Sequence, residues 1–260
     1  MRACVAWKIH VGRACVPFLA ALLLNGCVGG GAPADPYDLG PKALVATGGD
    51  GSIEGPLPGA GSAQSHFPLV SGATWTFHHT SVLDEPWDET DSISETTYEG
   101  QPAFVLSDQE DAEGEQTHST LIVDGTRVYR AYKEVAVGHV VAVTTTYEPA
   151  FLRYDEAWTE NGLSVTLDDD WTQICVVAST ASSCATGAVK VGTTTHTYTV
   201  LDVDDELTVP AGTFRSVKLQ RDNVSDPETK LFWFAAGVGK IREENPSTGA
   251  VSELTAYEIP

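Results

Sequence analysis

Basic residues are scarce in this chain. Its 260 residues include 15 Lys and Arg against 36 Asp and Glu, which gives a formal net charge of −21. A surface this acidic repels phosphate groups, so nucleic acid and anionic lipid headgroups are excluded as favourable partners. Hydrophobic residues are not scarce: they make up 42% of the chain, which excludes a disordered protein and is sufficient for a core.

The sequence also lacks an apolar run long enough to cross a bilayer. The most apolar stretch, residues 14–24, is about half the roughly 20 residues that a transmembrane helix needs. Lys8 and Arg13 precede this stretch, and no acidic residue occurs near it. A short apolar segment after basic residues is typical of a secretory signal peptide, which we predict over residues 1–26.

The apolar stretch ends in Leu24-Asn25-Gly26-Cys27. This tetrapeptide resembles the lipobox of bacterial lipoproteins, although Asn25 is larger than the residue usual at its position. The resemblance implies that Cys27 becomes the mature N-terminus and carries diacylglycerol and an N-linked acyl chain such as palmitate, so the membrane is an expected partner. Val28 in place of Asp favours the outer membrane under the sorting rule of such proteins. The alternative is a plain secretory signal with an incidental cysteine.

Residues 27–65 are rich in Gly and Pro and show no periodic apolar pattern, which predicts a flexible tether behind Cys27. From residue 66 to residue 260 the pattern is that of short strands separated by turns. Strands are expected at 75–77, 116–123, 126–137, 139–147, 172–178, 192–203, 213–221, 229–235 and 250–258. The best helical candidate, residues 149–158, would form two turns at most. We therefore predict an all-β domain, an antiparallel half-barrel or barrel, preceded by the tether.

Two predicted strands, residues 135–143 and 231–235, are almost entirely apolar instead of alternating. Such strands are covered on both faces or border an apolar interior. If the interior is open, it could bind an acyl chain or another apolar ligand, and the expected wall residues are Val141, Val143, Phe232 and Phe234. Near Phe214 the apolar residues also change from odd to even positions or the reverse, which predicts a bulge or a bend just after Gly212.

Cysteine is rare in the predicted domain, where only Cys175 and Cys184 occur. In an oxidising envelope compartment they should form a disulfide across a hairpin. Two unpaired thiols are the alternative. Metal binding is less favoured, because no His lies beside them and the spacing differs from that of zinc sites.

Four segments of the domain form a recognisable pattern. They are Gly72-x-x-Trp75-x-Phe77, Val209-Pro210-Ala211-Gly212-Thr213-Phe214, residues 232–239 and Glu253-Leu254. Together they are similar to a diffuse group of bacterial surface lipoproteins of uncharacterised function. That resemblance covers residues 66–260 and implies a β-rich half-barrel similar to the lipoprotein carriers of the outer-membrane sorting system. Ala236 stands where that group more often has Pro. No catalytic residue is implied.

Catalytic motifs are missing: the chain has neither G-x-S-x-G nor H-E-x-x-H. Carboxylates crowd residues 84–115, which could ligate a divalent cation, but no D-x-[DN]-x-[DN]-G loop occurs and a solvated acidic loop is favoured. We therefore expect no cofactor, no metal and no enzymatic activity. The expected function is that of a non-enzymatic lipoprotein of the cell envelope with a structural or protein-interaction role. It is expected to be lipid-anchored in the outer membrane, on the periplasmic face or at the cell surface. The alternatives are an apolar-ligand binding module and, less favoured, a hydrolase.

Overall fold

The computed structural model describes residues 59–82, 85–111, 114–177 and 184–260. The predicted signal peptide, Cys27 and most of the tether lie outside these residues. The described chain is all-β, as predicted. It contains no helix that is long and apolar enough to cross a membrane. Its twelve strands are β1 (Thr74–Thr80), β2 (Trp87–Tyr98), β3 (Gln101–Ser107), β4 (Glu115–Asp124), β5 (Arg127–Val137), β6 (Val140–Asp155), β7 (Ser164–Cys175), β8 (Val189–Val209), β9 (Gly212–Asn223), β10 (Glu228–Ala235), β11 (Gly239–Asn245) and β12 (Ala250–Glu258).

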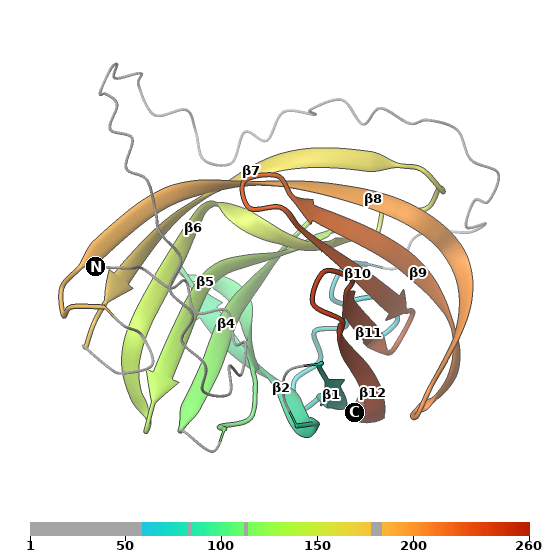
Figure 1. Ribbon diagram of the computed structural model, residues 1–260, viewed down its shortest axis with the longest axis horizontal. Coiled ribbons are helices and arrows are strands. Elements are labelled where there is room, and N and C mark those ends of the chain that lie inside the picture. The colour runs from blue at the N-terminus through green and yellow to red at the C-terminus, as the bar shows by residue number, and fades with distance from the viewer. Residues whose placement is uncertain (1–58, 83–84, 112–113, 178–183) are drawn as a thin grey trace.

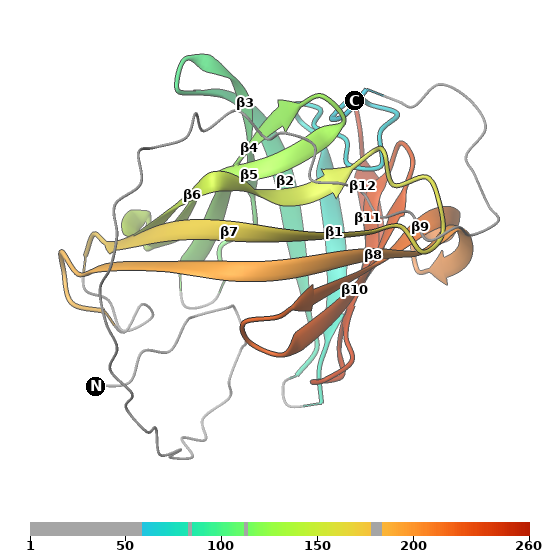
Figure 2. The ribbon, with the colours of Figure 1, turned by 90° about the horizontal axis from the view of Figure 1, so that it is seen from above.

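The strands form a closed antiparallel barrel in which each strand pairs with its neighbours in sequence. The first and last strands close it, because β1 pairs with β12 from Thr74 opposite Glu258 to Thr80 opposite Val251. Figure 1 shows β4, β5 and β6 facing β9 to β12 across the barrel, with β7 and β8 arching over both groups. Figure 2 shows β7 and β8 running side by side along the length of the molecule. Of the two predicted forms, the closed barrel is the one observed.

The alternation of buried and exposed side chains along the strands explains how a polar sequence folds into this barrel. In β7 the middle one of three consecutive aspartates, Asp169, is buried, while Asp168 and Asp170 are exposed and accept hydrogen bonds from Thr195 and Thr193 of β8. Successive side chains of a strand point to opposite faces. The run of aspartates is therefore strand, with one carboxylate inside the barrel and two outside.

Segments 84–115 and 149–158 differ from the expectation. The acidic segment was expected to be a solvated loop, but most of it forms β2 and β3, which pair from Ser92 opposite Ser107 to Tyr98 opposite Gln101. The helical candidate 149–158 begins as the end of β6, which pairs with β5 as far as Asp155. In both segments the structure is determined by pairing with a neighbouring strand. This pairing cannot be recognised from the local apolar pattern.

The predicted irregularity near Phe214 is present but lies in a different strand. Burial in β9 switches parity between Ser216 and Val217, which are both buried. The register shifts fall between Val200 and Asp205 of the partner strand β8, so the extra residues of the bulge belong to β8. A bulge bends and twists the strand that contains it, which is consistent with the arch of β8 in Figure 1.

The described N-terminal segment packs on the barrel before β1 begins. Residues 59–65, which the sequence assigns to the tether, form turns, and Ser65 is fully buried. The Ser65 carbonyl accepts a hydrogen bond from the backbone N–H of Gly237. The backbone N–H of His66 donates to the buried carboxylate of Glu156, whose other oxygen lies 2.8 Å from His66 Nδ1. These contacts hold the entry of the chain against one end of the barrel.

Candidate functional site in the barrel interior

The strand register identifies the side chains that face the barrel interior. Residues directly opposite each other in a ladder share a face of the sheet. Buried Trp75 and Phe77 of β1 lie opposite Asp91 and Glu89 of β2, so these carboxylates are on the interior face. On the other side of the barrel, Arg221 lies opposite both Tyr198 and Lys230. The interior is therefore aromatic and charged and not uniformly apolar.

Three arginines surround one aromatic ring in this interior. The guanidinium carbons of Arg130, Arg153 and Arg221 lie 5.8, 5.9 and 5.5 Å from the centroid of Phe151. Arg130 comes from β5, Arg153 and Phe151 from β6, and Arg221 from β9. The Arg221 guanidinium also lies 5.1 Å from the centroid of Phe232. Cation–π contacts of this kind orient each guanidinium, but they leave its positive charge in place.

The charges of this cluster affect one another. Burial, followed by the positive charges of Arg130 and Arg221, lowers the pKa of Arg153 to about 9. Burial and the charge of Arg130 lower the pKa of Lys133, three residues further along β5, to about 8. Within the ranges that the structure describes, no carboxylate forms an ion pair with Arg130 or Arg153, and the buried Nε of Arg130 has no hydrogen-bond partner. This region of the interior is positive in a strongly acidic protein.

A cavity of about 60 Å³ lies beside Arg153. Its polar lining consists of Arg153, Asp91 and Lys240, and its apolar lining includes Phe67, Trp75 and Phe77. Burial raises the pKa of Asp91 to about 7, the positive charge of Lys240 opposes this shift, and the charges of Glu89 and Asp108 add to it. The cavity thus combines an apolar wall with two cations and one carboxylate that is easily protonated.

A second charged group of the interior is internally balanced. The Glu243 carboxylate accepts hydrogen bonds of 2.9 Å from both Lys230 and Lys240. Burial raises the pKa of Glu243, but the charges and hydrogen bonds of the two lysines outweigh burial and hold it well below its ordinary value. This triad shows how the barrel compensates buried cations where a carboxylate is within reach.

The interior also contains a buried His–Asp pair. The Nδ1 atom of His196 lies 2.6 Å from Asp169 Oδ2, and the His196 ring packs edge-on against Phe151 at 5.2 Å. Burial raises the pKa of Asp169, and the hydrogen bond from His196 opposes that shift. His196 contacts Asp169, Phe151 and Tyr198, so this pair orients a ring beside the arginine cluster. No three His, Cys, Asp or Glu side chains of the described residues are grouped to hold a metal ion.

The four residues predicted to form an apolar wall do not come together in one wall. Phe232 and Phe234 are buried and stack at 6.1 Å, and Phe234 is covered further by Phe67 at 6.0 Å and Tyr154 at 4.8 Å. They belong to a core cluster with Tyr154 and Trp158 that includes neither Val141 nor Val143. Val143 is buried elsewhere on β6, opposite Val135, and half-buried Val141 lies opposite Ala136 beyond a bulge.

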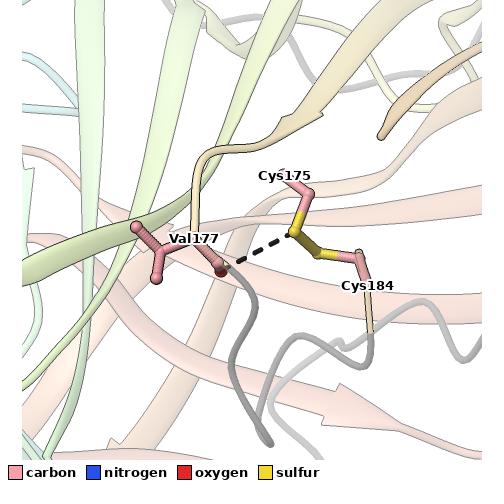
Figure 3. The surroundings of a disulfide bond; sticks show 3 residues. All are labelled: Cys175, Val177 and Cys184. Atoms are coloured by element: carbon pink, nitrogen blue, oxygen red, sulfur yellow. Dashed lines mark hydrogen bonds between the residues drawn. A yellow bond between two sulfur atoms is a disulfide. The ribbon is translucent and has the colours of Figure 1, made fainter. Parts of the chain in front are cut away.

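The predicted disulfide is present. Cys175 at the end of β7 is bonded to Cys184, nine residues later, with the Cα atoms 6.1 Å apart. Figure 3 shows the bond beside Val177, whose carbonyl oxygen lies 3.6 Å from Cys175 Sγ. The bond therefore ties the end of β7 to the chain that leads into β8.

The arginine cluster is the feature that sequence reasoning missed. Arg130, Arg153 and Arg221 are far apart in the chain, and each lies in a strand of mixed polarity. One signal was available for two of them: in an acidic chain with few basic residues, Arg130 and Arg153 stand between apolar or aromatic neighbours at Tyr129-Arg130-Ala131 and Leu152-Arg153-Tyr154. Arg221, between Gln220 and Asp222, has no such signal. Their convergence, however, depends on the register of the ladders across the barrel.

The fold and the interior define a closed antiparallel β-barrel with an arginine-rich, aromatic interior. No family model and no curated protein matches this chain. Among solved structures it is similar to a protein from Parabacteroides distasonis that is provisionally described as a lipoprotein, with 11% sequence identity and a TM-score of 0.29. The match covers 74% of this chain and 98% of that chain. At this identity and TM-score the likeness carries no argument about fold or function.

Proposed function

We propose that this protein is a lipoprotein of the bacterial cell envelope, anchored through acylated Cys27, whose β-barrel serves a non-enzymatic interaction or binding role. The observation that carries the proposal is the tetrapeptide Leu24-Asn25-Gly26-Cys27 at the end of the apolar stretch of residues 14–24. A diacylglycerol group together with an N-linked acyl chain gives stable membrane anchorage, which a single chain does not.

The outer membrane is the proposed location, because Val28 follows Cys27 and Asp does not. Three features of the chain support a barrel that is tethered to a membrane outside the cytoplasm. The Cys175–Cys184 disulfide is typical of an oxidising compartment. Residues 28–58 supply enough Gly and Pro to separate a folded barrel from a membrane surface. The net charge of −21 also keeps the barrel away from anionic headgroups, so the anchor and not the barrel surface provides the attachment.

The anchorage is tested by replacing the proposed acylation site. Cys27→Ser should move the protein from the membrane fraction to the soluble fraction, because the acceptor for diacylglycerol is lost. Cys15→Ser is the matched control: it removes another cysteine of the predicted signal peptide and should leave the protein in the membrane fraction. If the Cys27→Ser protein stays with the membrane after a carbonate wash, something other than acylation of Cys27 holds it there.

A further inference from the structure

We infer that the barrel interior contains a binding site for a small oxyanion, a carboxylate or a phosphate group, held by Arg153 in the cavity that this residue lines, with the charge of Arg130 close by. This site goes beyond the proposed anchorage and does not depend on it. Three observations support the site: two interior arginines without an ion pair, guanidiniums gathered around one aromatic ring, and a small cavity beside Arg153.

The first observation is the imbalance of charge. Five other cations of the described chain are paired with carboxylates at 3.1 Å or less: Arg127 with Asp155, Arg215 with Asp204, Arg242 with Glu244 and Glu253, and Lys230 and Lys240 with Glu243. Arg130 and Arg153 have no such partner among the described residues, although each lies in the interior. A buried charge without a partner is strongly destabilising. An anion from solution would supply the missing partner.

The second observation is that the guanidiniums are already oriented. All three guanidinium carbons lie within 6 Å of the centroid of Phe151, so the three charges are gathered around one ring. The charges of Arg130 and Arg221 reach Arg153 strongly enough to lower its pKa. Neighbouring planar guanidiniums match the geometry of carboxylate and phosphate oxygens, which they bind through paired N–H donors. The buried, unpartnered Nε of Arg130 is one such donor.

The third observation is the cavity of about 60 Å³ next to Arg153. Pockets for drug-sized ligands usually exceed about 300 Å³, so this cavity suits a small anion and excludes a full acyl chain. Its polar lining consists of Arg153, Lys240 and Asp91, and the pKa of about 7 lets Asp91 take up a proton beside an anion. Arg130 lies outside this lining and acts through its charge on Arg153. The apolar lining by Phe67, Trp75 and Phe77 faces a short hydrocarbon substituent on the anion. Phosphate and a short-chain carboxylate both present anionic oxygens to the guanidiniums. Only the carboxylate carries a hydrocarbon chain.

The experiment measures binding of sodium phosphate and of sodium butyrate to the full-length protein, purified in a nonionic detergent, by isothermal titration calorimetry at constant ionic strength. The variants are Arg130→Gln and Arg153→Gln. Arg215→Gln is the matched control, because Arg215 is an exposed arginine paired with Asp204 on the outer surface. We expect saturable binding of at least one anion to the wild-type protein, at least ten-fold weaker binding to both interior variants, and unchanged binding to Arg215→Gln.

The relative affinities of the two anions identify the ligand. Tighter binding of butyrate indicates an organic carboxylate with its chain in the cavity, and tighter binding of phosphate indicates a phosphate group. Two results overturn the site: no saturable binding of either anion to the wild-type protein, or equal affinity in the wild-type protein and both interior variants. If one variant does not fold, Arg130→Lys takes its place. This substitution keeps the positive charge but removes the paired N–H donors of the guanidinium, so it should weaken binding by a smaller factor.

Discussion

At the scale of the residue, this barrel buries ionisable groups in two ways. Glu243 is ionised because two lysines contact its carboxylate, whereas Asp91 has no ion pair within the described ranges and its pKa is raised to about 7. The two carboxylates lie on the same interior face, so the difference comes from their partners. Lys133 is similar to Asp91, because burial favours the neutral form of its side chain and lowers its pKa to about 8.

Asp91 makes the stability of the barrel depend on pH. Its pKa is about 7 in the folded protein and near the ordinary value of 3.8 in the unfolded chain, so the folded state holds the proton more tightly. That contribution to stability is complete below about pH 4 and is lost as the pH rises through 7. Asp91→Asn keeps the site neutral at every pH. Its Tm should therefore exceed that of the wild-type protein by more at pH 8.5 than at pH 4.5.

The control for this comparison is Glu95→Gln, which removes an exposed carboxylate from the same strand. It accounts for the general effect of removing one negative charge from an acidic protein. A Tm difference between Asp91→Asn and the wild-type protein that stays constant across this pH range would show that Asp91 does not titrate in the folded state as proposed.

At the scale of the element, the β7–β8 ladder depends on a close contact between a glycine and an aromatic ring. Gly192 of β8 lies opposite Trp171 of β7, and a Cβ at position 192 would come within 2.6 Å of the indole. Gly192→Ala should therefore displace Trp171 and break its hydrogen bond to Thr194, which destabilises the barrel by about 1–3 kcal/mol.

A double-mutant cycle in denaturant tests the cause of that loss. In a Trp171→Leu background the clash is absent, so Gly192→Ala should cost much less than in the wild-type protein. Equal costs in the two backgrounds would mean that the loss comes from the backbone of β8 and not from Trp171.

The Cys175–Cys184 disulfide is the second feature that stabilises the β7–β8 ladder. Closing a loop of nine residues stabilises by about 3 kcal/mol in the chain-entropy account. Dithiothreitol should lower the Tm of the wild-type protein and leave that of a Cys175→Ala/Cys184→Ala variant unchanged. An unchanged Tm of the wild-type protein after complete reduction would show that the end of β7 is held without the bond.

The elements also show which parts of the fold can be predicted from the sequence. Strands such as β5, β9 and β12 follow a β-branched or alternating pattern, and the disulfide follows from cysteine count and compartment. β2, β3 and β11 were missed. In β2 and β11 the interior positions include Glu89, Asp91 and Glu243, so the apolar alternation is lost. The same charged interior explains why the arginine cluster was not predicted: three residues from three strands converge only once the barrel register is known.

At the scale of the whole molecule, basic and acidic residues are distributed unequally between the interior and the outside of the barrel. Much of the basic charge of the described chain faces the interior, while acidic residues predominate in the chain as a whole. A net charge of −21 keeps the barrel soluble and repels anionic surfaces. The proposed arrangement therefore combines an acyl anchor at Cys27 with a barrel that does not adhere to headgroups, joined by a Gly- and Pro-rich tether.

The central claim of this account is that the barrel is a lipid-anchored module. The most direct test is intact mass spectrometry of the full-length gene product, purified from its native membrane in a nonionic detergent. The account predicts a mature chain that begins at Cys27 and carries the added mass of a diacylglycerol group and one N-linked acyl chain. An unacylated chain, or a mature N-terminus at any other residue, would contradict it.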